Sequence, residues 1–238
     1  MSNKIREMPP AEGGNLMETE ADRDHLDAVL GNLPEVQVGH DLWQNDFHEF
    51  DVLDHTRDFV RQIATLSNDR NIRAAGWLHD IGKPVVATPK LDKAGKPMER
   101  QPGQPYHEFT DHEIVGEEMV KKMPAELFAD LDLDQEKVAS LVGCHYLPMK
   151  GIKAMRQTMN FVDFKTAFNQ LSHTLDEASV TKEEILDMFV ADKLAQGKFC
   201  TDREELFAIR EALLDPAIEE ADLLRLYDLQ KQMYGNKE

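Results

Sequence analysis

The most informative stretch of the sequence is Trp77-Leu78-His79-Asp80-Ile81-Gly82-Lys83-Pro84. It places an imidazole and a carboxylate side by side at the end of an apolar run. Both groups need partners if they are buried, because an unpaired polar group costs free energy in a protein interior. A glycine and a proline follow at once, as they do where a helix ends. We therefore expect the pair at the end of a helix over about 72–81, from where both side chains can reach one ion.

Further histidines and an aspartate at wider spacing are candidate partners for this pair. Imidazole nitrogens and carboxylate oxygens suit Mn, Fe, Co, Ni, Zn or Mg without selecting one. A single histidine of this kind is more simply interpreted as a hydrogen-bonded core residue. The whole set favours a metal centre, because all members lie on expected helices beside apolar residues. The expected ligands of one or two divalent ions are His55, His79, Asp80, His112, His145 and Asp192.

The bulk composition indicates a cytoplasmic protein. The chain has 238 residues, of which 41% are apolar and 30% charged, enough for one large domain. No apolar run approaches the roughly 20 residues of a membrane span, and the first residues lack the hydrophobic segment of a signal peptide. Cys144 and Cys200 are too few for a disulfide framework, so we expect reduced thiols.

Charge is distributed unevenly along the chain. The net charge of −18 should repel nucleic acid, so generic duplex binding is not expected. A small phosphorylated substrate remains compatible, because residues 137–162 contain basic residues and no acidic ones. Lys150, Lys153 and Arg156 follow His145 at spacings of three and could bind phosphate at the mouth of a pocket. The alternative is a solvated charged face.

Apolar periodicity predicts an all-α fold with one small β excursion. Residues 84–108 interrupt the helical pattern and predict a short hairpin or flap. Thr181, followed by two glutamates at positions 183 and 184, has the form of a helix cap. Helices are expected over about 19–30, 52–66, 72–81, 111–122, 134–146, 160–171, 181–196, 203–214 and 217–234.

Several segments together resemble a known family. They are Phe47-His48-Glu-Phe-Asp51, Ala74-Ala-Gly-Trp-Leu-His79-Asp-Ile-Gly-Lys83-Pro, Asp111-His-Glu-Ile-Val-Gly116 and Leu141-Val-Gly-Cys-His145. This pattern resembles the HD superfamily of metal-dependent phosphohydrolases, and most of all the HD domain of bacterial tRNA nucleotidyltransferases, over about 45–197. The chain lacks the catalytic head domain of those enzymes, which has a Gly-Ser stretch followed by paired aspartates, so nucleotide addition is not expected.

The resemblance implies roles for individual residues. His55, His79, Asp80 and Asp192 would hold one metal, and His112 and His145 would add a second, as in dinuclear relatives. Lys83 would contact a substrate phosphate and act with Asp80 in catalysis; its alternative is a solvated lysine at a helix end. His48 is the better candidate for a proton donor, with His107 as the alternative.

The implied activity is hydrolysis of a nucleotide or related small phosphoester, either a monoester or a cyclic or other diester, by metal-activated water. Two alternatives stay open: a di-iron oxygenase of the HD fold, and a non-catalytic sensor of a phosphorylated ligand. The expected domain plan is a mobile arm over 1–18, an HD domain over 19–200, and C-terminal helices over 201–238 that pack on or extend it.

Overall fold

The computed structural model describes residues 20–234. The mobile arm predicted over 1–18 lies outside them. Helices dominate, and the strands form two small two-stranded sheets, so the expected all-α class with a small β insertion is confirmed. None of the helices between residues 20 and 234 is long and apolar enough to cross a membrane.

The elements follow one another in this order. They are α1 (Glu20–Gly31), α2 (Pro34–Gln37), α3 (Val52–Ile63), α4 (Arg70–Leu78), α5 (Lys83–Val86), β1 (Thr88–Pro89), β2 (Glu99–Gln101), β3 (Gln104–Pro105), β4 (His107–Glu108), α6 (His112–Lys122), α7 (Ala125–Asp130), α8 (Gln135–Cys144), α9 (Leu147–Gln157), α10 (Phe161–Asp176), α11 (Lys182–Leu194), the 3-10 turn η1 (Gly197–Phe199), α12 (Arg203–Leu214) and α13 (Glu220–Tyr234).

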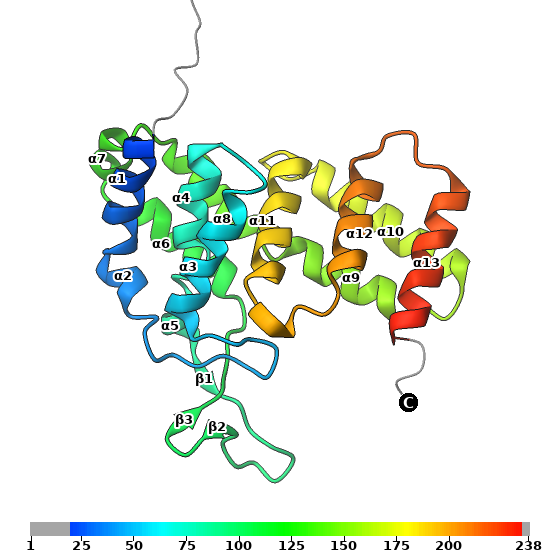
Figure 1. Ribbon diagram of the computed structural model, residues 1–238, viewed down its shortest axis with the longest axis horizontal. Coiled ribbons are helices and arrows are strands. Elements are labelled where there is room, and N and C mark those ends of the chain that lie inside the picture. Colours follow the sequence, from blue (N-terminus) through cyan, green and yellow to red (C-terminus); the bar gives the residue numbers. More distant parts are fainter. Residues whose placement is uncertain (1–19, 235–238) are drawn as a thin grey trace, which may run out of the picture.

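Two apolar cores lie side by side and share one helix. Helices α1 to α4 and α6 to α8 surround the first core, and α9, α10, α12 and α13 surround the second. Figure 1 shows α11 between these two groups. Met188 and Ala191 of α11 pack into the first core, while Phe189 and Val190 pack into the second. A helix buried on several faces is apolar nearly all round, so a charged residue on α11 needs a specific partner.

The ends of two site-forming helices follow from their capping residues. Asp51 accepts a hydrogen bond from the backbone N–H of Asp54 and so begins α3 at Val52. The predicted cap at Thr181 is confirmed as a full capping box with Glu184 at the start of α11. These caps fix the first turn of α3 and the register of α11, both of which contribute side chains to the site.

The segment around the His-Asp pair differs from the predicted single helix. Helix α4 ends at Leu78, and a separate short helix, α5, begins at Lys83. Pro84 lies in the first turn of α5, where a proline has no helical hydrogen bond to lose. The proline therefore starts a helix where the sequence pattern predicted an end. Residues 79–82 form the tight connection between the two helices.

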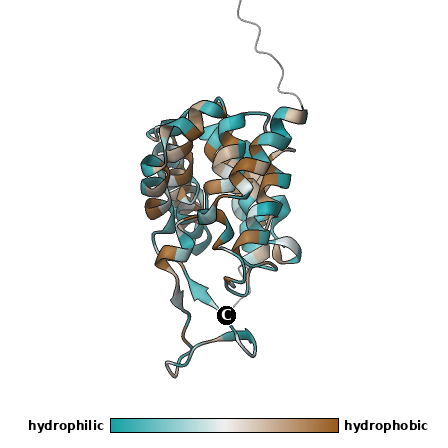
Figure 2. Ribbon diagram, turned by 90° about the vertical axis from the view of Figure 1, so that its left-hand side faces the viewer, coloured by the Kyte–Doolittle hydropathy of each residue, from teal (hydrophilic) through white to brown (hydrophobic). Residues whose placement is uncertain are grey.

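The predicted flap exists, with a different pairing. Strand β1 pairs with β4, and β2 pairs with β3, both antiparallel. Val85 and Val86, expected in the hairpin, belong instead to α5. The insertion extends from one end of the helical body and is mostly hydrophilic (Figure 2). Helix α9 occupies the stretch after His145 that the sequence pattern left unassigned, and α2 and α7 are further short helices that it did not predict.

Gly82 should tolerate no side chain. A Cβ there would overlap the carbonyl oxygen of His112 and lie 2.8 Å from the backbone nitrogen of Gly116. Backbone atoms of a packed helix cannot move aside, so Gly82→Ala should lower the free energy of unfolding by about 3 kcal/mol. Gly116→Ala is the milder control: the atom nearest to its Cβ would be a methyl carbon of Val142 at 3.0 Å, and about 1 kcal/mol is expected. Equal losses in urea unfolding would contradict this account.

Candidate metal centre

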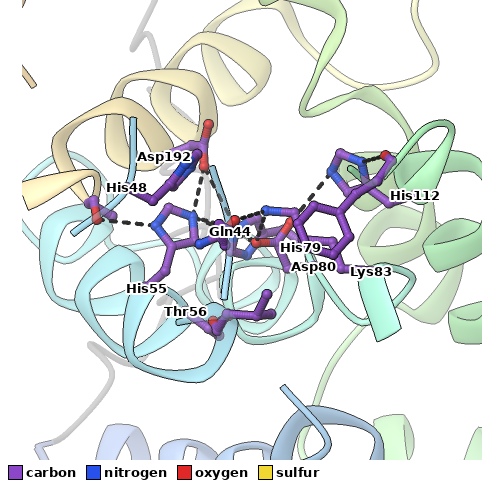
Figure 3. Close-up of polar contacts among 12 residues, drawn as sticks. Gln44, His48, His55, Thr56, His79, Asp80, Lys83, His112 and Asp192 are labelled. Atoms are coloured by element: carbon purple, nitrogen blue, oxygen red, sulfur yellow. Dashed lines mark hydrogen bonds and ion pairs between the residues drawn. The ribbon is translucent and has the colours of Figure 1, made fainter. Parts of the chain in front are cut away.

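Five helices deliver the predicted ligands to one buried place. The first turn of α3 carries His55, and α11 carries Asp192. The other side chains come from helix ends: His79 and His145 directly follow α4 and α8, and His112 begins α6. Figure 3 shows His55 and Asp192 on one side, His112 on the other, and Asp80 between them. The structure thus brings the six predicted residues together.

Every histidine of the set is held in the same way. Its Nδ1 contacts a backbone carbonyl oxygen, which can only accept, so Nδ1 carries a proton and Nε2 is the atom left to face the others. At the C-terminal end of a helix, as at Gly76 of α4 and Val142 of α8, such a carbonyl lacks a helical partner, and the imidazole satisfies it. For His55, His79, His112 and His145 the carbonyls belong to Ala195, Gly76, Phe109 and Val142, at 3.1, 2.8, 2.9 and 2.6 Å.

The first ligand group consists of His55, His79 and Asp80. Nε2 of His55 and Nε2 of His79 lie 3.4 Å apart, and Oδ2 of Asp80 lies 3.6 and 3.2 Å from them. Asp192 adds a carboxylate oxygen, 2.9 Å from Nε2 of His55 and 3.9 Å from Nε2 of His79. Phe59 stacks on the His79 ring, with 4.3 Å between the ring centroids, and so fixes its plane.

The second group consists of Asp80, His112 and His145. Oδ1 of Asp80 lies 3.4 Å from Nε2 of His112, which in turn lies 3.3 Å from Nε2 of His145. Asp80 therefore belongs to both groups and turns a different oxygen to each. A carboxylate that serves two ligand sets in this way suits a bridge between two cations.

The residues fit a divalent cation. Oδ1 of Asp80 is buried and accepts no hydrogen bond from the residues between 20 and 234. Burial lowers the pKa of His145 to about 3 and also lowers that of His112, so both rings are neutral near pH 7. Their unprotonated Nε2 atoms face each other, an arrangement that repels unless a cation lies between the lone pairs. Nitrogen and oxygen donors of this kind bind divalent metals.

Lys83 is buried, which removes its interpretation as a solvated cation. Its Nζ donates to Oδ2 of Asp80 and to Oε1 of Gln44, each at 2.6 Å, and lies 5.3 Å from the centre of the Phe109 ring. Burial alone would raise the pKa of Asp80, but His79 and the Lys83 ammonium outweigh it and hold that pKa well below its usual range. Asp80 is therefore a carboxylate anion that can bind a metal ion or pair with an ammonium group.

His48 lies beside the first group. Its Nδ1 is 3.0 Å from Oδ1 of Asn45, and its ring meets the His55 ring edge-on at 5.1 Å between centroids. Burial is the largest cause that lowers the pKa of His48 well below its ordinary value. A neutral ring accepts a proton more readily than it gives one. His107 was the alternative proton donor. Its Nδ1 contacts the carbonyl oxygen of Trp43 at 2.9 Å, and this contact joins β4 to the loop between α2 and α3.

Of the three basic residues after His145 that were predicted to bind phosphate, two lie near the second group. Lys150 donates to Glu113, the neighbour of His112, at 2.8 Å. Lys153 donates to the hydroxyl of Tyr146 at 3.1 Å, and the Tyr146 ring meets the His112 ring with 5.7 Å between centroids.

Arg156 is different. It pairs with buried Glu205 and Asp202, and its guanidinium lies 4.3 Å from the centre of the Tyr234 ring. The structure therefore uses Arg156 to join α9 to α12 and α13 and does not bring it to the ligand groups.

Sequence reasoning missed two buried polar residues beside the ligands, Gln44 and Glu113. Glu113 sits next to His112 in the sequence, which was a usable signal. Gln44 lies in a loop without periodicity, and only its contact with Lys83 reveals it. A third cluster of possible ligands, His40, Asp41 and Asp51, is largely exposed. Both carboxylate oxygens of Asp51 already accept backbone hydrogen bonds.

Comparisons with known proteins give a family match and a curated relative. The family model of the HD domain matches residues 52–197, more than half of the chain. The A-adding tRNA nucleotidyltransferase of Deinococcus radiodurans is 30% identical over 128 residues, which are 52% of this chain and 27% of that protein. The chain thus spans about a quarter of that relative's length. No solved structure matches the chain.

Removing a ligand from the first group should empty it. The variant His79→Ala lacks one of the buried nitrogen ligands. Its affinity for Mn, Co or Ni should therefore be at least tenfold lower than that of the wild type. His173→Ala is the control, because His173 is exposed and contacts only Glu177. Metal affinity would be measured by titration calorimetry on untagged protein. Unchanged affinity in His79→Ala would remove His79 from the ligand set.

The two ligand groups should bind metal ions independently. Because His112 belongs to the second ligand group and not to the first, His112→Ala should lower the saturating metal content from two ions per chain toward one. Elemental analysis after dialysis measures this content. A wild-type ceiling of one ion would instead assign His112 and His145 to substrate.

Proposed function

The chain belongs to the HD domain family, that of metal-dependent phosphohydrolases, and on this premise we propose that it hydrolyses a nucleotide or related small phosphoester. The scissile bond would be that of a monoester or of a cyclic or other diester. The observation that carries the proposal is Asp80: its two oxygens face two ligand groups, and one of them is buried without a hydrogen bond. The catalytic and substrate-contacting roles below are part of the proposal.

A divalent cation bound by these ligands supplies Lewis acidity toward water and toward phosphoryl oxygens. The protein contributes imidazoles that are held by their Nδ1 hydrogen bonds, so the Nε2 atoms are oriented before any ligand arrives. Phe59 and the buried backbone around His79 exclude water from that side. Electrostatic interactions are stronger in such a site than in bulk water.

Lys83 would hold the phosphoryl group. An ammonium has three N–H donors, and Lys83 directs two of them to Asp80 and Gln44. The third is available to a substrate oxygen, whose negative charge grows as the ester bond breaks. Asp80 keeps the ammonium beside the ligand groups, so its positive charge needs no rearrangement during the reaction.

His48 would handle the proton. With Nδ1 donating to Asn45, Nε2 is the atom free to take a proton. A ring with a lowered pKa takes up a proton only transiently and can pass it to the alcohol that leaves. His48 would thus first accept a proton and then donate it. A general acid that is already protonated before the reaction is not expected here, because burial disfavours the charged ring.

The charges favour a small substrate. The chain carries −18 overall, which repels a long polyanion. Near the second group, Lys150 and Lys153 flank Tyr146, and the side chain of Lys150 is 55% exposed. A mononucleotide or a terminal phosphate would feel mainly this local charge, because salt screens the distant acidic surface within about 10 Å.

The test is a panel of phosphoesters assayed with Mn, Mg, Co and Ni: nucleoside monophosphates, cyclic nucleotides and a long single strand. We expect phosphate release or ring opening from the small compounds and little internal cutting of the strand. Oxygen consumption without phosphate release would replace the hydrolase by an oxygenase. Binding without turnover under every metal would make the chain a sensor.

Lys83→Ala should reduce the stabilisation of the transition state without removing the bound metal. The loss of one charge-assisted contact should raise the activation free energy derived from kcat/KM by about 1.5–3 kcal/mol. Elemental analysis should show normal metal content. Lys165→Ala is the control, because Lys165 is an exposed lysine of α10 that pairs with Glu220. Unchanged kinetics in Lys83→Ala would show that Lys83 only neutralises Asp80.

A further inference from the structure

Gln44 is a buried amide at the edge of the metal centre. Only 2% of its surface is exposed. Its Oε1 accepts a hydrogen bond from Lys83, whereas its Nε2 is buried and has no acceptor among the residues that the structure describes. Buried amide groups are nearly always hydrogen-bonded, so an unpaired one at a site points to a missing partner. Figure 3 shows Gln44 close to Lys83 and Asp80.

The contact with Lys83 fixes which way the amide is turned. An ammonium only donates, so the atom 2.6 Å from Nζ must be the amide oxygen. The NH₂ group then occupies the other position and presents donors alone. The missing partner must therefore accept hydrogen bonds, which excludes an ammonium group or a metal cation.

The loop around Gln44 holds it in place. Trp43 forms a backbone bridge with Asp51, and its carbonyl oxygen contacts His107 of β4 at 2.9 Å. On the other side, the backbone of Val52 donates to Leu42. These contacts hold the backbone around Gln44 between the start of α3 and the flap, and the hydrogen bond from Lys83 holds its side chain. A polar group held in this way is preorganised for a ligand.

We propose that Gln44 is a substrate-binding residue that donates its Nε2–H to a phosphoryl oxygen of the substrate. This inference rests on the proposed function. Gln44 Nε2 and the remaining N–H of Lys83 would form a pair of donors on adjacent side chains, one neutral and one cationic. A phosphoryl group, with several oxygens that only accept, matches such a pair better than an alcohol or a base does.

The experiment uses inorganic phosphate as the probe and titration calorimetry with the Mn-loaded full chain. Gln44→Glu keeps the oxygen that holds Lys83 and replaces NH₂ by an acceptor of the same shape. Gln44→Met removes both polar atoms without adding charge. Gln170→Glu, at an exposed position of α10, adds the same charge away from the site. Metal content and Tm are measured for each protein.

We expect phosphate affinity to fall about tenfold or more in both Gln44→Glu and Gln44→Met, as for a lost hydrogen bond to a charged group. Metal content should stay at the wild-type level, and Gln170→Glu should bind phosphate normally. Wild-type affinity in Gln44→Glu would overturn the inference, because Gln44 would then serve only to hold Lys83. Wild-type affinity in Gln44→Met would overturn it as well, because no hydrogen bond to phosphate would then have been lost.

Failure of the proposed function has a different signature. In that case the Mn-loaded wild type itself binds no phosphate, and the inference falls with the phosphohydrolase. If the wild type binds phosphate and Gln44→Glu matches it, only the role of Gln44 is lost.

Discussion

The site depends on the carboxylate of Asp80, which is shared between two sets of imidazoles. One oxygen meets Lys83, His55 and His79, and the other meets His112. A buried anion is costly unless it is compensated, and here one ammonium and several imidazoles surround it. The unprotonated Nε2 atoms of His112 and His145 repel each other unless a cation lies between them. The arrangement is therefore explained by cation binding and not by stability, because apolar side chains of the same size would make a more stable core.

The helices serve this carboxylate through their ends. His79 and His145 follow the last residues of α4 and α8, where free carbonyls need donors, and their Nδ1 atoms provide them. The same hydrogen bond that completes a helix end turns Nε2 toward the site, so local helix chemistry and ligand orientation are one feature. Helix α11 lies between both cores and places Asp192 beside His55. The close approach at Gly82 lets the turn between α4 and α5 reach α6.

Much of this was predictable from the sequence, and the failures have physical causes. Periodicity located most helices, and the order of His and Asp residues predicted a ligand set that the structure gathers in one place. The end of α4 was misjudged because a proline is compatible with both the end of one helix and the first turn of the next. Arg156 was expected near the phosphate because it follows Lys150 and Lys153 at regular spacing. Its partner, Glu205, is 49 residues away, and spacing carries no information about such a contact. Gln44 was missed for the same reason, since its importance lies in a contact with Lys83 across 39 residues.

The central claim is that the shared carboxylate and its imidazoles hold divalent cations, and the most direct test locates the ions. Crystals grown with Mn would be measured by anomalous diffraction at the manganese edge. Strong peaks are expected within coordination distance of Asp80, one beside His55 and His79 and another beside His112 and His145. Anomalous density confined to another place, such as the exposed cluster of His40 and Asp41, with none beside Asp80, would contradict it.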